Sequence, residues 1–268
     1  MEILMVKTKA WAATAAAALS LAVLAAAPTA SAEPAPEADP LLAYAEQNPH
    51  DFIGINALAE QLLGQSIQFS VSGIDGPVDA ATADLLSNQA PQEGIAARAV
   101  PTDAFSVVGY WLPTPGRTAT YMGTWNFRDD YVNGSAPDDF ASIMFDFSNR
   151  CLTAVSTTYN SYYYDGERTT DSAAYLKDGG VGGAPIVGLR DAVSGFKLNV
   201  DHGHISSTVT RKLGCDAQSF GAQFAYEHNQ DGGSAGSVSA SFIGGLSIGY
   251  SGSPATMQKS TNPTYINF

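Results

Sequence analysis

The residues whose type and spacing could support chemistry begin with two histidines, His202 and His204, on either side of a glycine. Residues i and i+2 of a β-strand point to the same face, so two imidazoles here could hold a zinc ion. A third ligand could come from His228, Asp201 or Glu227. The spacing fixes no full ligand set, and a polar strand face with a turn at the glycine is the simpler interpretation.

An acidic segment, residues 128–139 (RDDYVNGSAPDD), is a second candidate. Its carboxylates belong to Asp129, Asp130, Asp138 and Asp139, and hard oxygen ligands of this kind suit calcium. The segment does not match the calcium-loop pattern of alternating acids, a central glycine and a final glutamate. Because Asp, Asn, Gly and Pro are also common turn residues, we expect a turn, with calcium binding as the alternative.

Aromatic residues form a third candidate site, a binding surface for a glycan or a protein. Flat rings cover apolar area while a tyrosine hydroxyl stays hydrated, which suits both kinds of partner. The densest run is residues 159–165 (YNSYYYD), and strand alternation puts Tyr162 and Tyr164 on one face and Tyr163 on the other. The predicted binding residues are Tyr159, Tyr162, Tyr163, Tyr164, Trp111 and Trp125.

Several catalytic signatures are absent from the sequence, among them the HExxH zinc motif and the phosphate-binding glycine loops. No pair of carboxylates is marked for glycoside hydrolysis. We therefore expect a non-enzymatic protein. A secreted, metal-assisted hydrolase that uses His202 and His204 remains the enzymatic alternative.

The elements that must position these residues are mostly strands. From residue 102 onward, short runs of alternating or β-branched residues are separated by Gly, Pro, Asn and Asp. The predicted strands cover residues 105–112, 117–127, 141–147, 152–164, 186–189, 196–200, 204–213, 220–226 and 237–250. Their near-regular spacing predicts a mainly β fold, an antiparallel β-sandwich or β-barrel-like domain over residues 102–268.

Residues 220–250 are predicted to form a hairpin that turns at NQDGG. The second strand alternates Ser and Gly with small apolar residues, and it superficially resembles the membrane-inserting hairpins of β-pore-forming toxins. This resemblance implies a pore-forming or membrane-inserting protein as a further alternative function. Ordinary edge or core strands are the simpler interpretation.

A short helical segment precedes the β-rich part. Residues 41–63 are predicted to be helical with a break at Asn48–Pro49 and an end at Gly64, and residues 79–87 form another short helix. Between them, residues 66–72 read as a strand, and residues 88–101 as a linker. The apolar helical face, Phe52, Ile55, Ala59, Leu62 and Leu63, must be buried. We expect these helices to cover the β-domain, with a removable propeptide as the alternative.

The N-terminus predicts export. Lys7 and Lys9 precede an uncharged Ala/Leu-rich run, and Ala30–Ser31–Ala32 then predicts signal-peptide cleavage before Glu33. The start of the mature chain, residues 33–40, has a composition typical of disorder. In an oxidising compartment Cys151 and Cys215 are expected to form one disulfide.

Charge limits the partners. The chain carries 13 Lys and Arg against 26 Asp and Glu, and removal of residues 1–32 changes the net charge from −13 to −14. Such a charge repels phosphate backbones, so nucleic acid is not an expected partner. Together these features predict a secreted or envelope-associated recognition protein that binds a glycan or protein partner through a Tyr-rich β surface.

Overall fold

The computed structural model describes residues 39–88, 103–114, 116–128, 138–146, 151–162, 174–178, 184–190, 193–194, 197–198, 200–215, 218–231, 234–252 and 255–268. The chain divides into two compact units, Met1–Glu37 and Ala38–Phe268, and every described residue lies in the second. The predicted signal peptide and nearly all of the predicted linker therefore lie outside the described residues.

The N-terminal part contains three helices, and an aspartate caps the start of each. They are α1 (Pro40–Gln47), α2 (Phe52–Leu63) and α3 (Ala80–Ser87). The carboxylates of Asp39, Asp51 and Asp79 accept hydrogen bonds from first-turn backbone N–H groups, which otherwise have no partner in a helix. Gly64 ends α2 in the left-handed conformation, with φ 67°. Among the described residues, no helix has the length and apolar character needed to span a bilayer.

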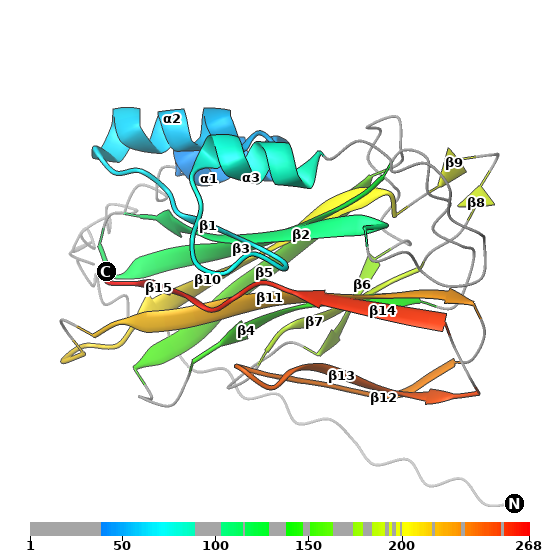
Figure 1. Cartoon of the computed structure of the whole chain (residues 1–268). Coiled ribbons are helices and arrows are strands. Elements are labelled where there is room, and N and C mark those ends of the chain that lie inside the picture. Colours follow the sequence, from blue (N-terminus) through cyan, green and yellow to red (C-terminus); the bar gives the residue numbers. More distant parts are fainter. Residues whose placement is uncertain are drawn as a thin grey trace, which may run out of the picture. The chain divides into compact units, whose positions relative to one another are not determined.

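The strands form two antiparallel sheets, sheet A and sheet B (Figure 1). Sheet A has the order β1 (Phe69–Val71), β2 (Phe105–Pro113), β3 (Thr118–Phe127), β10 (His202–Arg211) and β5 (Leu152–Tyr162). Sheet B has the order β14 (Ala255–Ser260), β11 (Phe220–Asp231), β4 (Asp139–Phe145), β7 (Ile186–Leu189) and β6 (Ala174–Asp178), and β15 (Thr264–Ile266) also pairs with β11. Two short pairs, β8 (Val193–Ser194) with β9 (Lys197–Leu198) and β12 (Ser234–Ser241) with β13 (Gly245–Ser251), complete the set.

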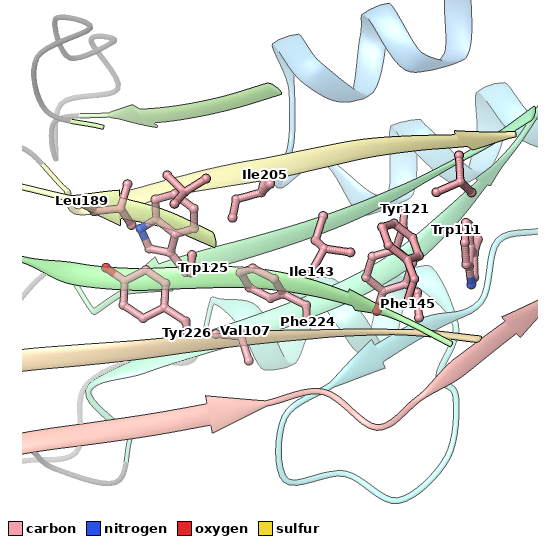
Figure 2. Packing of buried hydrophobic residues seen from close by; sticks show 14 of the residues in the cluster. Val107, Trp111, Tyr121, Trp125, Ile143, Phe145, Leu189, Ile205, Phe224 and Tyr226 are labelled. Carbon is pink, nitrogen blue, oxygen red and sulfur yellow. The ribbon is translucent and has the colours of Figure 1, made fainter. Parts of the chain in front are cut away.

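The main core lies between the two sheets. Trp125, Tyr121 and Ile205 of sheet A pack against Ile143 and Phe224 of sheet B, and all five are fully buried (Figure 2). The aromatic rings supply most of this buried apolar area, which is the main stabilising contribution to such a core. The predicted mainly β, antiparallel sandwich is thus confirmed.

A second apolar cluster lies between the helices and the outer face of sheet A. Phe52 and Ile55 of α2 are fully buried against Tyr110 of β2 and Met122 of β3. The helices therefore cover this face of sheet A. The predicted apolar face was too wide, because Leu62 is 44% exposed.

The C-terminal hairpin differs from its prediction. Strand β11 pairs with β4, β14 and β15, whereas β12 pairs with β13, so the expected pairing of 220–226 with 237–250 is wrong. A turn at Phe242–Gly244 folds the second stretch back on itself, and Gly245 follows it with φ 74°. The hairpin packs Leu246 against Phe140 on the outer face of sheet B. It thus acts as a cover for this sheet (Figure 1).

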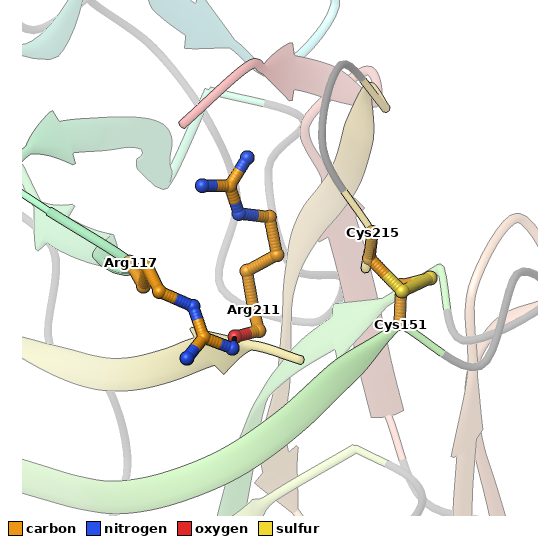
Figure 3. Close-up of a disulfide and its surroundings, with 4 residues drawn as sticks. All are labelled: Arg117, Cys151, Arg211 and Cys215. Carbon is orange, nitrogen blue, oxygen red and sulfur yellow. Dashed lines mark hydrogen bonds between the residues drawn. A yellow bond between two sulfur atoms is a disulfide. The ribbon is translucent and has the colours of Figure 1, made fainter. Parts of the chain in front are cut away.

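The predicted disulfide is confirmed. Cys151 immediately precedes β5, Cys215 follows β10, and their Cα atoms are 5.8 Å apart (Figure 3). The backbone N–H of Lys212 also donates to the carbonyl of Cys151 at 2.8 Å. The disulfide therefore joins the start of β5 to the segment that follows the neighbouring strand β10.

Candidate functional site

The outer face of sheet A changes character along the sheet. Over β1 and β2 it is apolar and lies under the helices, on β3 Met122 is the one apolar residue among threonines and Asn126, and over β10 and β5 it is polar. On β10, Ile205 and Val209 face the core between the sheets, so the alternate residues face outward. The outward residues of the two strands pair as His204 with Asn160, Ser206 with Thr158 and Thr208 with Ser156. We name this surface the polar shelf: Ser156, Thr158, Asn160, His202, His204, Ser206 and Thr208.

Helix α1 supplies a carboxylate at the border of the polar shelf. Oε1 of Glu46 accepts hydrogen bonds from Oγ1 of Thr158 at 2.7 Å and from Oγ of Ser206 at 2.8 Å. The two hydroxyl oxygens are 2.5 Å apart. Ser206 is buried beneath this contact, but Thr158 remains exposed. The shelf therefore has a buried floor tied to α1 and an exposed polar rim along β5.

The histidines of the shelf meet a third histidine, which the sequence analysis did not select. His50, in the turn between α1 and α2, places its ring centroid 5.5 Å from that of His202. Nδ1 of His202 lies 3.1 Å from a carboxylate oxygen of Asp201, and Nε2 of His204 lies 3.4 Å from Nδ2 of Asn160. Both ring nitrogens of His50 are buried, and neither has a hydrogen-bond partner within the described part of the chain.

The zinc hypothesis needs at least one ligand besides His202 and His204. In the residues that the structure describes, no three or more His, Cys, Asp or Glu side chains are arranged to hold a metal ion. Of the three candidates for the next ligand, His228 and Glu227 lie on β11 of sheet B. The carboxylate of the other candidate, Asp201, is hydrogen-bonded to His202. His202 and His204 lie on one face of β10, and zinc binding there stays a prediction.

The stability of the contact at His50 should depend on pH. Burial first, then the neighbouring imidazoles of His202 and His204, hold the pKa of His50 well below its ordinary value of 6.5. The pKa of His50 is thus lower in the folded protein than the ordinary 6.5 expected in the unfolded chain. Between these two pKa values the unfolded chain binds a proton that the folded chain does not. The contribution of His50 to the free energy of unfolding is therefore fully present above pH 6.5 and is lost as the pH falls below it. Glu46 and Asp51 on the flanking helices and Asp201 on the strand side are the nearby acids.

We expect His50→Gln to flatten this pH dependence, because glutamine does not titrate. The measurement is the free energy of unfolding by urea at pH 7.5, 6.5 and 5.5 for the wild type and the variant. The contributions of all other titratable groups are the same in both proteins, so they cancel when one pH profile of the free energy of unfolding is subtracted from the other. Parallel pH profiles for the two proteins would show that His50 does not carry the effect.

The acidic segment is only partly described, since residues 129–137, including Asp129 and Asp130, lie outside the described residues. Asp138 is half-buried just before β4. Asp139 belongs to β4 and is fully buried, and its oxygens accept from Tyr226 and from the backbone N–H of Asn229. We had expected Asp139 to lie in a turn or a calcium loop. It lies instead in a strand, and its carboxylate oxygens accept hydrogen bonds inside the protein.

The predicted aromatic binding residues are divided by the structure. The rings of Trp111 and Trp125 lie in the core, and their indole N–H groups donate to the carbonyls of Thr264 and Val200, so neither ring is presented to a partner. Tyr159 is half-buried against the same core. The backbone of Tyr162 pairs with His202 at the end of the polar shelf. Tyr163 and Tyr164 lie outside the described residues.

The G-x-S-x-G pattern of hydrolases was expected to be absent, but G-G-S-A-G at residues 232–236 formally fits it. In those enzymes the serine sits on a turn between a strand and a helix. Here Ser234 begins β12 of an antiparallel hairpin, and its hydroxyl lies 2.8 Å from that of Ser251. The context is therefore not that of a nucleophilic serine.

No protein-family model and no curated protein matches the chain. Among solved structures, it is similar to the major pilin subunit of Bacillus cereus, with 13% identity and a TM-score of 0.30 over 55% of this chain and 52% of that one. The pilus backbone protein of Streptococcus pneumoniae gives 10% identity and a TM-score of 0.28 over 57% and 44%.

A structure described as manganese lipoxygenase of Gaeumannomyces graminis with part of zonadhesin of Komagataella pastoris gives 9% identity and a TM-score of 0.29 over 59% of this chain and 50% of that one. The chain thus spans about half the length of the solved structures that it matches. At TM-scores near 0.3 these similarities carry no argument about function.

Proposed function

We propose that the protein is exported and acts as a non-enzymatic recognition protein that binds a glycan on the polar shelf. The observation that supports this proposal most directly is the set of hydroxyl, amide and imidazole groups on one face of β10 and β5. Ser156 and Thr158 are exposed, so these hydroxyls of the rim are accessible, whereas Asn160 and His202 are half-buried and Oδ1 of Asn160 is buried.

The chemistry of the rim fits sugar hydroxyls. Each sugar hydroxyl both donates and accepts hydrogen bonds, and Ser, Thr, Asn and neutral His side chains together offer both roles. Glu46, bonded to Thr158 and Ser206, orders the hydroxyls beforehand and so reduces the entropic cost of binding. The net charge of −13 opposes anionic sugars, which favours a neutral glycan as the ligand.

Removal of single polar groups from the rim should weaken binding. We expect Thr158→Val and Asn160→Ala each to raise the Kd for the best neutral glycan about 3- to 10-fold, the effect of losing one neutral hydrogen bond. The ligand would be found on a glycan array with the purified protein. The Kd values would then be measured by calorimetric titration.

The matched control is Thr256→Val, the same substitution at an exposed position of β14 in sheet B. It should leave the Kd unchanged. If no neutral glycan binds, or if all three variants bind equally well, the polar shelf is not a glycan site. Capture of a protein ligand that depends on Thr158 and Asn160 would replace the glycan with a protein partner.

A further inference from the structure

Strand β5 is an unusually long edge strand. It lies at one end of sheet A, has 11 residues, and pairs with β10 along its length. The other edges formed by described strands are shorter: β1 has three residues, β6 five and β14 six. An edge strand presents a row of backbone N–H and C=O groups that another strand can pair with.

The sequence of β5 carries none of the side chains that usually protect such an edge, although a β-bulge opposite Thr208 and Val209 interrupts its pairing with β10. Edge strands commonly carry a lysine, a proline or an inward-pointing charge that blocks pairing with another chain. Strand β14 includes Lys259, and β6 includes Lys177 and Asp178. Strand β5 reads LTAVSTTYNSY, with no charged residue, no proline and no glycine. Ser156 and Thr158 are exposed on the outer face of sheet A, so the side chains at the middle of the strand are accessible.

We propose that a second copy of this chain pairs its β5 with this edge in antiparallel register, which joins two copies of sheet A into one continuous sheet. Two properties of β5 favour a second copy as the occupant. Its lack of charge allows two strongly acidic chains to approach here without direct repulsion between the strands. Its Ser/Thr-rich centre is also self-complementary: pairing about Thr157 places Ser156 opposite Thr158 of the second copy, and Thr–Ser pairs are favourable across strands.

Such a dimer would have two-fold symmetry with the axis perpendicular to the sheet. Because strand alternation is preserved across the pair, the outer faces of both copies lie on the same side of the joined sheet. The two polar shelves would then form one extended surface. The dimer itself does not require any ligand on the shelf, so its test is independent of the proposed function.

The test is the mass of the purified protein by light scattering during size-exclusion chromatography, over concentrations up to about 1 mM, where weak dimers are populated. We expect the mass to rise from that of one chain to that of two. Ser156→Lys, which adds a charge to the exposed edge, should keep the protein monomeric throughout. The matched control is Ser239→Lys, the same change at an exposed position of β12, and it should dimerise like the wild type.

Hydrogen exchange identifies the contact. Backbone amides of residues 152–162 should exchange more slowly in the dimer than in the monomer, whereas those of β12 and β13 should not change. A wild type that is monomeric at every concentration would overturn the proposal. So would a dimer that persists in Ser156→Lys, or one whose protection falls on another strand.

Discussion

Replacement of Asp139 by alanine is expected to lower the free energy of unfolding by about 3–5 kcal/mol, the loss typical when one member of a buried polar pair is removed. Asp139 is fully buried between the sheets, and three groups depend on it. Tyr226 donates its hydroxyl at 2.6 Å, Asn229 donates its backbone N–H at 2.8 Å, and Nδ1 of His228 lies 3.0 Å from the carboxylate. Alanine would leave all three buried groups without this partner, and each such loss is costly.

Chemical denaturation of the purified protein measures this effect, with two further variants for comparison. Asp139→Asn keeps one acceptor oxygen and a similar shape, so it should cost less than alanine. Asp75→Ala removes an exposed carboxylate and should change stability by no more than about 0.5 kcal/mol. A loss at Asp139→Ala as small as that at Asp75→Ala would contradict a structural role for the buried carboxylate.

Local signals in the sequence predicted the local elements well. The helices begin close to the expected positions and Gly64 ends α2, because capping and termination involve residues only a few positions apart. The alternation of apolar and polar residues likewise located most strands of the sandwich. Strands β14 and β15 were missed because each is short and they lie on either side of the Ser260–Pro263 break.

Long-range partners could not be predicted in this way. Asp138 and Asp139 are neighbours in an acidic segment, and nothing nearby shows that the second one turns inward. Inside the protein the carboxylate of Asp139 contacts the imidazole of His228, which is 89 residues away in the chain. The same limit applies to His50, which reaches His202 only because the helices pack on sheet A.

Gly203 shows how a packing requirement can resemble a motif. The sequence suggested that this glycine marks a turn between His202 and His204, but it lies within β10. A Cβ atom there would be 2.3 Å from the ring of Trp125 and 2.4 Å from the carbonyl oxygen of Asn160, so no larger residue fits. The histidine spacing in the polar shelf therefore reflects the close packing of β5, β10 and the core.

A second large effect is expected on removal of the Cys151–Cys215 disulfide, which closes a segment with a sequence separation of 64. In the chain-entropy model, a loop of this length gives about 4 kcal/mol of stability, because the bond limits the unfolded chain. We expect the Cys151→Ala/Cys215→Ala double variant to lose about that much in chemical denaturation. Reducing agent should destabilise the wild type similarly and leave the double variant unchanged.

The position of this disulfide links stability to the proposed sites. It joins the start of β5 to the segment after β10, the two strands that carry the polar shelf and, on β5, the proposed dimer contact. Loss of the bond should therefore speed hydrogen exchange in residues 152–162 more than in β11, which is held by strands on both sides. Equal acceleration in both strands would mean that the disulfide stabilises the whole sandwich and does not specifically hold β5, the strand of the proposed glycan site and the proposed dimer contact.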